Sequence, residues 1–398
     1  MPWRHVEVMK ERFQFVRDAR RRLVSFTELC AIYGISRPVG YKWLHRAEHS
    51  GMNYLEELSR RPHECPHATP PALTGRLLEV RRHHPTWGPR KLLALVRRQD
   101  QRRGLELPWP ARSTVAELLR RNGLTNRRRR RVRRGHPGRP LTPMTAPNVI
   151  WTADYKGQFR LRDGRYCFPL TVQDGYSRYL LGCRGLTGTT TNESRPVFQR
   201  LFQEYGLPEI LRSDNGVPFA TQALARLSEL SVWWIRLGIY PELIEPAHPE
   251  QNGRHERMHR TLKQATTLPP ALSPRSQQQR FDVFRAEYNE VRPHEALQDA
   301  TPASIYERSP RPYPNTLPPM EYPAHFEVRF VSANGGIRWH NGWVNVSHVL
   351  GGQHIGFEEI DDGEWDVYFG RMKIGRFHER LRRIEDAQGR LARKRVKV

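Results

Sequence analysis

The middle of this 398-residue chain contains four motifs in order: WTADYKG (151–157), VQDGYSRYLLG (172–182), LRSDNGVPF (211–219) and HPEQNGRHERMHRTLK (248–263). The first two lie in runs of β-branched and aromatic residues that predict three strands, with Asp163-Gly164 and Asp174-Gly175 as hairpin turns. A helix at NESRPVFQRLFQEYG, a fourth strand at EILRSDNG and a helix starting near Gln251 follow. Strands followed by alternating elements predict an α/β domain around a central sheet.

Three acidic residues stand at privileged places in these motifs: Asp154 in the first strand, Asp214 at the end of the fourth, and Glu256 on the last helix. Cleavage of a phosphodiester needs an activated nucleophile and a stabilised leaving oxygen, and two divalent ions held by carboxylates supply both. Taken singly, each acid has another interpretation: Asp154 as a solvated strand residue, Asp214 as part of an ordinary Asp-Asn-Gly turn, and Glu256 as an i,i+4 partner for Arg260.

The four motifs, with YNEVRPHEALQDATPASIY at 288–306, resemble the catalytic core shared by retroviral integrases and bacterial insertion-sequence DDE transposases. The resemblance covers roughly residues 145–310 and implies an RNase H-like integrase core. It implies a catalytic and metal-binding triad of Asp154, Asp214 and Glu256, with Glu256 preferred over Glu250 because it lies three residues after Gly253. Two Mg²⁺ ions per active site are implied, and the carboxylates also accept Mn²⁺.

The chain departs from the family in two respects. Asp214 and Glu256 are separated by a longer stretch than in many relatives, which a lengthened loop near SVWWIRLGIYPELIE would absorb. The retroviral N-terminal zinc module is absent, and His63, Cys65 and His67 lie in a Pro-rich stretch that we interpret as a linker. These departures favour a bacterial mobile-element enzyme over a retroviral one.

The composition indicates a polyanionic partner. The net charge is +25 and the pI about 10.6, mostly through arginine, whose guanidinium group pairs bidentately with phosphate. Four cysteines without CxxC spacing argue against a disulfide framework. With no apolar run of membrane-spanning length and no secretory signal, we expect no membrane partner and a cytoplasmic, nucleoid-associated protein of a bacterial cell.

Residues 1–62 predict an N-terminal helix-turn-helix DNA-binding domain. Ser25 and Glu28 form a capping box, and Gly34 allows a tight turn before a basic helix with an apolar stripe. A plain helical hairpin with a solvated basic face is the alternative. The candidate DNA contacts on this helix are Arg37, Lys42 and Arg46.

Residues 72–125 predict a second helix-turn-helix or winged-helix-like domain, in which Ser113 or Thr114 with Glu117 caps the last helix and Gly123 ends it. The Arg-rich linker at 126–144 has no apolar periodicity, and we expect it to contact DNA backbone without reading sequence. Its candidate DNA contacts are Arg127, Arg128, Arg129, Arg130, Arg131, Arg133 and Arg134.

Residues 320–390 alternate apolar and polar residues in six short runs with glycine in most connections, which predicts a small all-β barrel that binds DNA. The predicted fold class is therefore an RNase H-like α/β core, preceded by all-α helix-turn-helix modules and followed by this barrel. The chain ends in another basic tail, LARKRVKV.

Residues around the triad have weaker signals. Arg257, Arg260 and Lys263, like His259, lie on the helix of Glu256, where some are expected to face the DNA backbone and a solvated face is the alternative. Asn252 and His255 flank the glutamate and are interpreted as DNA contacts, or for Asn252 as a helix cap. Asp174, Asn215 and Gly216 are interpreted as turn residues, and Trp233 and Trp234 as core or loop anchors.

The sequence thus predicts a transposase or integrase that binds duplex DNA at the element's terminal inverted repeats and performs metal-dependent cleavage and strand transfer into target DNA. Holding two DNA ends implies a homo-oligomer assembled on DNA, and the need for an accessory ATPase regulator is left open. The rivals are a non-catalytic DNA-binding regulator derived from a transposase and an RNase H-type nuclease acting on RNA–DNA hybrids.

Overall fold

The computed structural model describes residues 8–49, 56–57, 68–105, 108–125, 141–245 and 248–386. The chain divides into two compact units, Met1–Ala68 and Thr69–Val398. The finer domain division that the sequence indicates stays a prediction. Within the described residues, none of the helices combines the length and the apolar character that crossing a bilayer requires.

The first unit consists of three helices, α1 (Val8–Arg21), α2 (Phe26–Ile32) and α3 (Arg37–His49). The predicted capping box is present at the start of α2, and Gly34 adopts a positive φ of 66° in the turn before α3. Six residues form its core: Phe15, Val16, Leu29, Cys30, Ile35 and Trp43.

The second unit begins with α4 (Pro71–His83), α5 (Pro89–Arg102) and α6 (Arg112–Arg121), which enclose a core around Trp87. The predicted cap of α6 is wrong, because the helix begins at Arg112, which leaves Ser113 and Thr114 inside it, and no side chain caps it. The carboxylate of Glu117 is already paired with Arg120 and Arg121, each at 2.7 Å. Gly123 follows α6 with a φ of 68°, as predicted for a helix end.

A six-stranded mixed sheet forms the centre of the second unit. Strand β3 pairs antiparallel with both β1 and β4, while β5 pairs parallel with β1 and with β6. The strand order is β2-β3-β1-β5-β6, with β4 beside β3. This is the RNase H-like arrangement that the resemblance implied. The strands are β1 (Ile150–Tyr155), β2 (Phe159–Arg160), β3 (Tyr166–Asp174), β4 (Leu180–Leu186), β5 (Ile210–Ser213) and β6 (Tyr240–Leu243).

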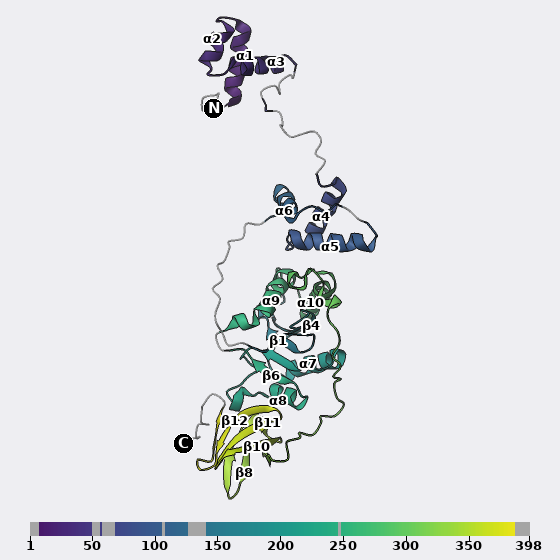
Figure 1. Cartoon of the computed structure of the whole chain (residues 1–398), viewed down its shortest axis with the longest axis vertical. Helices are drawn as coiled ribbons and strands as arrows, with labels where there is room; N and C mark the ends of the chain where they lie inside the picture. The colour runs from purple at the N-terminus through teal and green to yellow at the C-terminus, as the bar shows by residue number, and fades with distance from the viewer. Residues whose placement is uncertain are drawn as a thin grey trace. The chain divides into compact units, whose positions relative to one another are not determined.

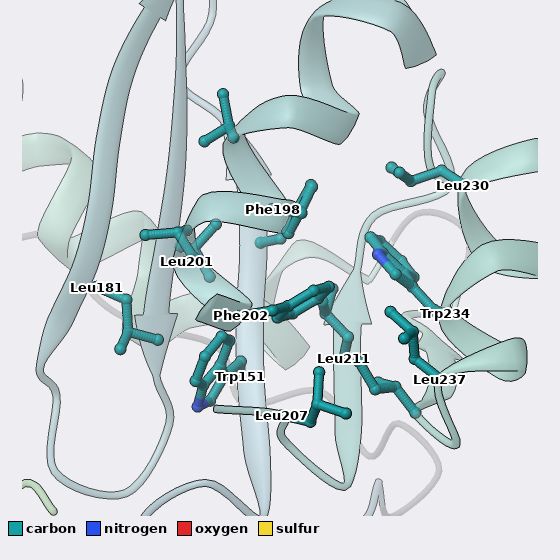
Figure 2. Packing of buried hydrophobic residues seen from close by; sticks show 14 of the residues in the cluster. Trp151, Leu181, Phe198, Leu201, Phe202, Leu207, Leu211, Leu230, Trp234 and Leu237 are labelled. Atoms are coloured by element: carbon teal, nitrogen blue, oxygen red, sulfur yellow. The ribbon is translucent and has the colours of Figure 1, made fainter. Parts of the chain in front are cut away.

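Helices α7 (Thr191–Tyr205) and α8 (Glu229–Arg236) make the crossovers that parallel pairing requires. Figure 2 shows Phe198 and Phe202 of α7 between Trp151 of β1 and Trp234 of α8. Trp151 and Trp234 have no exposed surface. The interpretation of Trp234 as a core residue is therefore confirmed, and this packing fixes β1 and β5 beside each other.

Helices α9 (Gly253–Thr266) and α10 (Pro274–Ala286) follow β6 and pack on each other. Met258 and Leu262 of α9 share a buried cluster with Phe281 and Phe284 of α10 and with Leu180 of the sheet. One face of α9 is thereby held against the sheet, which determines where its polar residues point. Short 3-10 and π segments occupy Leu224–Arg226, Pro249–Asn252, Glu287–Val291, Glu295–Leu297, Pro302–Ser304 and His348–Leu350.

The C-terminal region contains the six predicted strands and a seventh, but the predicted closed barrel is not confirmed. Five strands form an antiparallel sheet in the order β13-β12-β11-β10-β7, and β8 and β9 form a separate hairpin that contacts both edge strands. Val232 and Ile235 of α8 belong to the core of this region, which lies next to α8 in Figure 1. The strands are β7 (Glu327–Phe330), β8 (Gly336–Trp339), β9 (Gly342–Asn345), β10 (His354–Asp361), β11 (Glu364–Phe369), β12 (Met372–His378) and β13 (Arg383–Asp386).

Candidate active site

The parallel pairing of β1 with β5 brings two of the predicted acids together. Ala153 lies opposite Ser213 in this pairing, so that Asp154 and Asp214 follow at the same position along adjacent strands. Asp214 then begins a turn that is closed locally: Gly216 donates its N–H to the Asp214 carboxylate at 3.2 Å, and Asn215 donates to the carbonyl of Ile244 at 2.7 Å. Asn215 and Gly216 thus shape the turn that presents Asp214.

Glu256, on helix α9, lies close enough for its negative charge to act on the Asp154 carboxyl group. Burial, together with the negative charges of Asp214 and Glu256, raises the pKa of the Asp154 carboxyl to about 7, against a partial opposing effect from the Tyr155 backbone N–H and Lys156. Burial also raises the pKa of Asp214. Burial is the main cause of both shifts, and the negative charges of Asp214 and Glu256 add to the shift of Asp154, at a cost to the folded protein that a cation or a proton removes.

The donor atoms at this place fit a divalent cation. Among the described residues, no lysine or arginine forms a salt bridge with Asp154, Asp214 or Glu256, so no such cation competes with a metal for these carboxylates. Carboxylates are the ligands that Mg²⁺ and Mn²⁺ prefer. Asp154 also lies with His255 and His259 in a group whose candidate ligand atoms are all within 4.8 Å of one another.

Two histidines of α9 point into the protein beside Asp154, whereas the sequence predicted DNA contacts on this helix. His255 is fully buried and His259 is 6% exposed. Burial lowers the pKa of His255 to about 3 and that of His259 to about 2, so both rings are neutral. The prediction that His255 contacts DNA is therefore wrong in this structure, because the sheet covers it.

A sequence signal for these histidines exists but was missed. His255, Met258, His259 and Leu262 recur at the i, i+3, i+4, i+7 spacing of a buried helical face. Asn252 is also buried, and its side chain makes no capping hydrogen bond to α9. Both interpretations of Asn252, as a DNA contact and as a helix cap, are therefore wrong in this structure.

The other predicted residues lie in three places. Arg257, Arg260 and Lys263 are exposed on the outer face of α9, and their contact with DNA stays a prediction. On α3 of the first unit, Arg37 and Lys42 are exposed and Arg46 is half-buried over the ring of Trp43. The remaining predicted residues lie outside the described part of the chain: His63, Cys65, His67, the basic tail at 391–398, Arg127, Arg128, Arg129, Arg130, Arg131, Arg133 and Arg134.

Asp174 is a structural residue of the β3–β4 turn. Its buried carboxylate accepts hydrogen bonds from the N–H of Asn148 and from both the N–H and the hydroxyl of Ser177, at 2.8, 2.8 and 2.6 Å. With these partners it holds the turn closed, in agreement with the sequence interpretation.

Part of the chain matches models of known protein families. Residues 144–249 and 237–302 match two family models that are both described as an integrase core domain. Together the two matches span residues 144–302, about two fifths of the chain.

The chain is similar to proteins of bacterial insertion elements. It is 28% identical over 245 residues to an uncharacterized 31.7 kDa protein of insertion element IS407 from Burkholderia multivorans, covering 58% of this chain and 80% of that protein. It is 27% identical over 238 residues to an uncharacterized 39.2 kDa protein of IS476 from Xanthomonas euvesicatoria, covering 59% and 64%. It spans only 7% of the Gag-Pol polyprotein of woolly monkey sarcoma virus, at 28% identity over 30% of this chain.

Among solved structures, the magnesium complex of the HTLV-2 integrase catalytic core domain matches 42% of this chain and 100% of its own, with 16% identity and a TM-score of 0.33. A simian T-cell lymphotropic virus intasome in complex with PP2A regulatory subunit B56 gamma matches over 66% of this chain and 90% of its own chain, with 17% identity and a TM-score of 0.36.

Proposed function

We propose that this chain is a DNA transposase or integrase that binds the ends of a mobile element and catalyses metal-dependent DNA cleavage and strand transfer. The observation that carries the proposal is that the negative charges of Asp214 and Glu256 both act on the carboxyl group of Asp154, although the three residues belong to the end of β5, to α9 and to β1. Divalent ions held by these carboxylates supply nucleophile activation and stabilise the leaving oxygen.

The positively charged surface supports DNA as the substrate. A cleft of about 790 Å³ lies between α5, the start of α6 and the segment 298–304. Its one acidic residue, Asp299, is already paired with Arg90 at 2.8 Å. The remaining cationic charge suits a phosphate backbone. The arginines that line the cleft are Arg90, Arg97, Arg98, Arg102 and Arg112.

The similarity to insertion-element proteins makes the ends of such an element the proposed substrate. Two ends must be held together for strand transfer, so we propose that the protein acts as a homo-oligomer on DNA.

The test is an assay of strand cleavage and joining on labelled duplexes that carry the inverted repeats flanking the gene, with Mg²⁺ or Mn²⁺. Asp154→Asn, Asp214→Asn and Glu256→Gln should each abolish both reactions while end binding persists. The matched control is Glu250→Gln, an acidic residue six positions before Glu256, which should keep activity. Undiminished nicking by the Glu256→Gln protein would exclude the triad. Tight end binding without cleavage by the wild-type protein would instead support a DNA-binding regulator.

A second experiment tests the arginine cleft. Arg102→Gln should weaken duplex binding and reduce the slope of log affinity against log salt concentration by about one, because one phosphate contact is lost. Arg200→Gln, at an exposed arginine on α7, is the matched control and should leave the slope unchanged. An unchanged slope for Arg102→Gln would remove this side chain from the DNA path.

A further inference from the structure

Two threonine hydroxyl groups of the sheet connect the buried histidines of α9 to Asp154. The Thr171 hydroxyl lies 3.0 Å from the main-chain carbonyl of Asp154 and 2.7 Å from the Nε2 atoms of both His255 and His259. The Thr152 hydroxyl lies 2.7 Å from Nδ1 of His255. These contacts decide which nitrogen of each ring carries the proton.

A hydroxyl group has one proton to donate and two lone pairs that accept, whereas a carbonyl oxygen only accepts. The Thr171 proton is therefore donated to the Asp154 carbonyl, and both Nε2 atoms donate their protons to the Thr171 oxygen. In a neutral imidazole with its proton on Nε2, Nδ1 carries a lone pair. For His255 that lone pair accepts the proton of the Thr152 hydroxyl, whose other contact, to the carbonyl of Gln173, is longer at 3.2 Å.

The lone pair of His259 is directed differently. Its Nδ1 atom lies 3.7 Å from Oδ2 of Asp154. Two acceptor atoms thus face each other, and because His259 is only 6% exposed, water screens their repulsion poorly. A cation between them removes the repulsion. His255 offers no such atom, since both of its ring nitrogens are engaged by threonine hydroxyl groups.

We propose that Nδ1 of His259 is a ligand of the cation that Asp154 holds, so that the site contains three carboxylates and one imidazole nitrogen. This inference rests on the proposed function and adds a ligand to its site. It also assigns His255 and Thr171 to positioning, because they orient the His259 ring and fix its tautomer. Imidazole suits transition-metal ions better than Mg²⁺, so this ligand biases the site away from Mg²⁺.

The experiment uses the full chain without DNA, loaded with Mn²⁺, and pulsed electron paramagnetic resonance to detect nuclei bound directly to the metal. The expected result is a directly coordinated ¹⁴N signal that becomes a ¹⁵N signal when histidine alone is ¹⁵N-labelled. The signal should vanish in His259→Gln, and the dissociation constant for Mn²⁺ should rise at least about tenfold. His348→Gln, at an exposed histidine of the C-terminal region, is the matched control and should keep both.

The outcomes separate this inference from the proposed function. In one outcome, Asp154→Asn abolishes Mn²⁺ binding, but the wild-type protein shows no signal from a histidine nitrogen. This result would overturn the role of His259 and leave the triad intact. Mn²⁺ binding that survives Asp154→Asn would contradict the active site itself. The labelled wild-type protein gives a decision even where the His259→Gln protein fails to fold. Circular dichroism of each variant reports on folding.

Discussion

Replacing Asp154 by asparagine should stabilise the metal-free protein at pH 8. The side chain of Asp154 is 18% exposed, and its carboxyl pKa rises from 3.8 to about 7 in the folded protein. A difference of about three pKa units between the folded and unfolded chains corresponds to roughly 4 kcal/mol at a pH above both values. Asparagine keeps the shape and the acceptor for the Tyr155 N–H while it removes the charge, so most of this cost should disappear.

The sign of the pH dependence follows from the direction of the shift. Because the folded-state pKa is raised, the folded chain binds the proton more tightly, and wild-type stability falls as the pH rises from about 4 through about 7. The gap between Asp154→Asn and wild type should therefore be largest at pH 8 and close at about pH 4. Mg²⁺ should reverse the ranking, since it stabilises only the protein that binds it.

Denaturant unfolding in EDTA at pH 4, 6 and 8, followed by tryptophan fluorescence, measures the difference. Asp163→Asn is the matched control: the Asp163 carboxylate is paired with Arg165, which lowers its pKa, so its removal should not stabilise the protein. Equal stability of Asp154→Asn and wild type at pH 8 without metal would refute the reasoning, because it would mean that burial and the neighbouring carboxylates do not raise the pKa of Asp154.

Three further predictions concern other parts of the molecule. Thr171→Val should lower Mn²⁺ affinity by about tenfold and weaken the ¹⁴N signal of His259, because valine has no hydroxyl group to fix the tautomer of the ring. Metal titration of the variant measures the affinity. His378 lies between two glutamates that raise its pKa, so His378→Gln should destabilise the protein more at pH 6 than at pH 9, as measured by thermal unfolding. Gly40→Ala should lower the free energy of unfolding of an isolated Met1–Ala68 unit by about 1–3 kcal/mol, because the added methyl group would lie 3.0 Å from Phe15 in a packed core. The shift of the unfolding midpoint of this unit measures the effect.

Local sequence chemistry determined the secondary structure of this protein to a large extent. The capping box at Ser25, the positive φ at Gly34 and Gly123, and the Asp-Gly turns depend on a few neighbouring residues, and the structure contains all of them. The cap predicted at Ser113 or Thr114 was wrong because the helix begins at Arg112, so both residues lie inside its first turn. The closed C-terminal barrel was not confirmed, because the alternation of residues indicates strands but does not specify which edges pair.

The resemblance of its motifs predicted Asp154, Asp214 and Glu256 as the triad. Only the tertiary structure aligns Asp154 with Asp214, through the parallel β1–β5 pairing, and brings the charge of Glu256 to bear on Asp154. The position of His259 next to Asp154 and its contact with the Thr171 hydroxyl group also emerge only in three dimensions. Asp154, Thr171 and His259 lie far apart along the chain, and nothing local links them. Sequence specifies which groups are available, whereas packing of a shared core decides which of them meet.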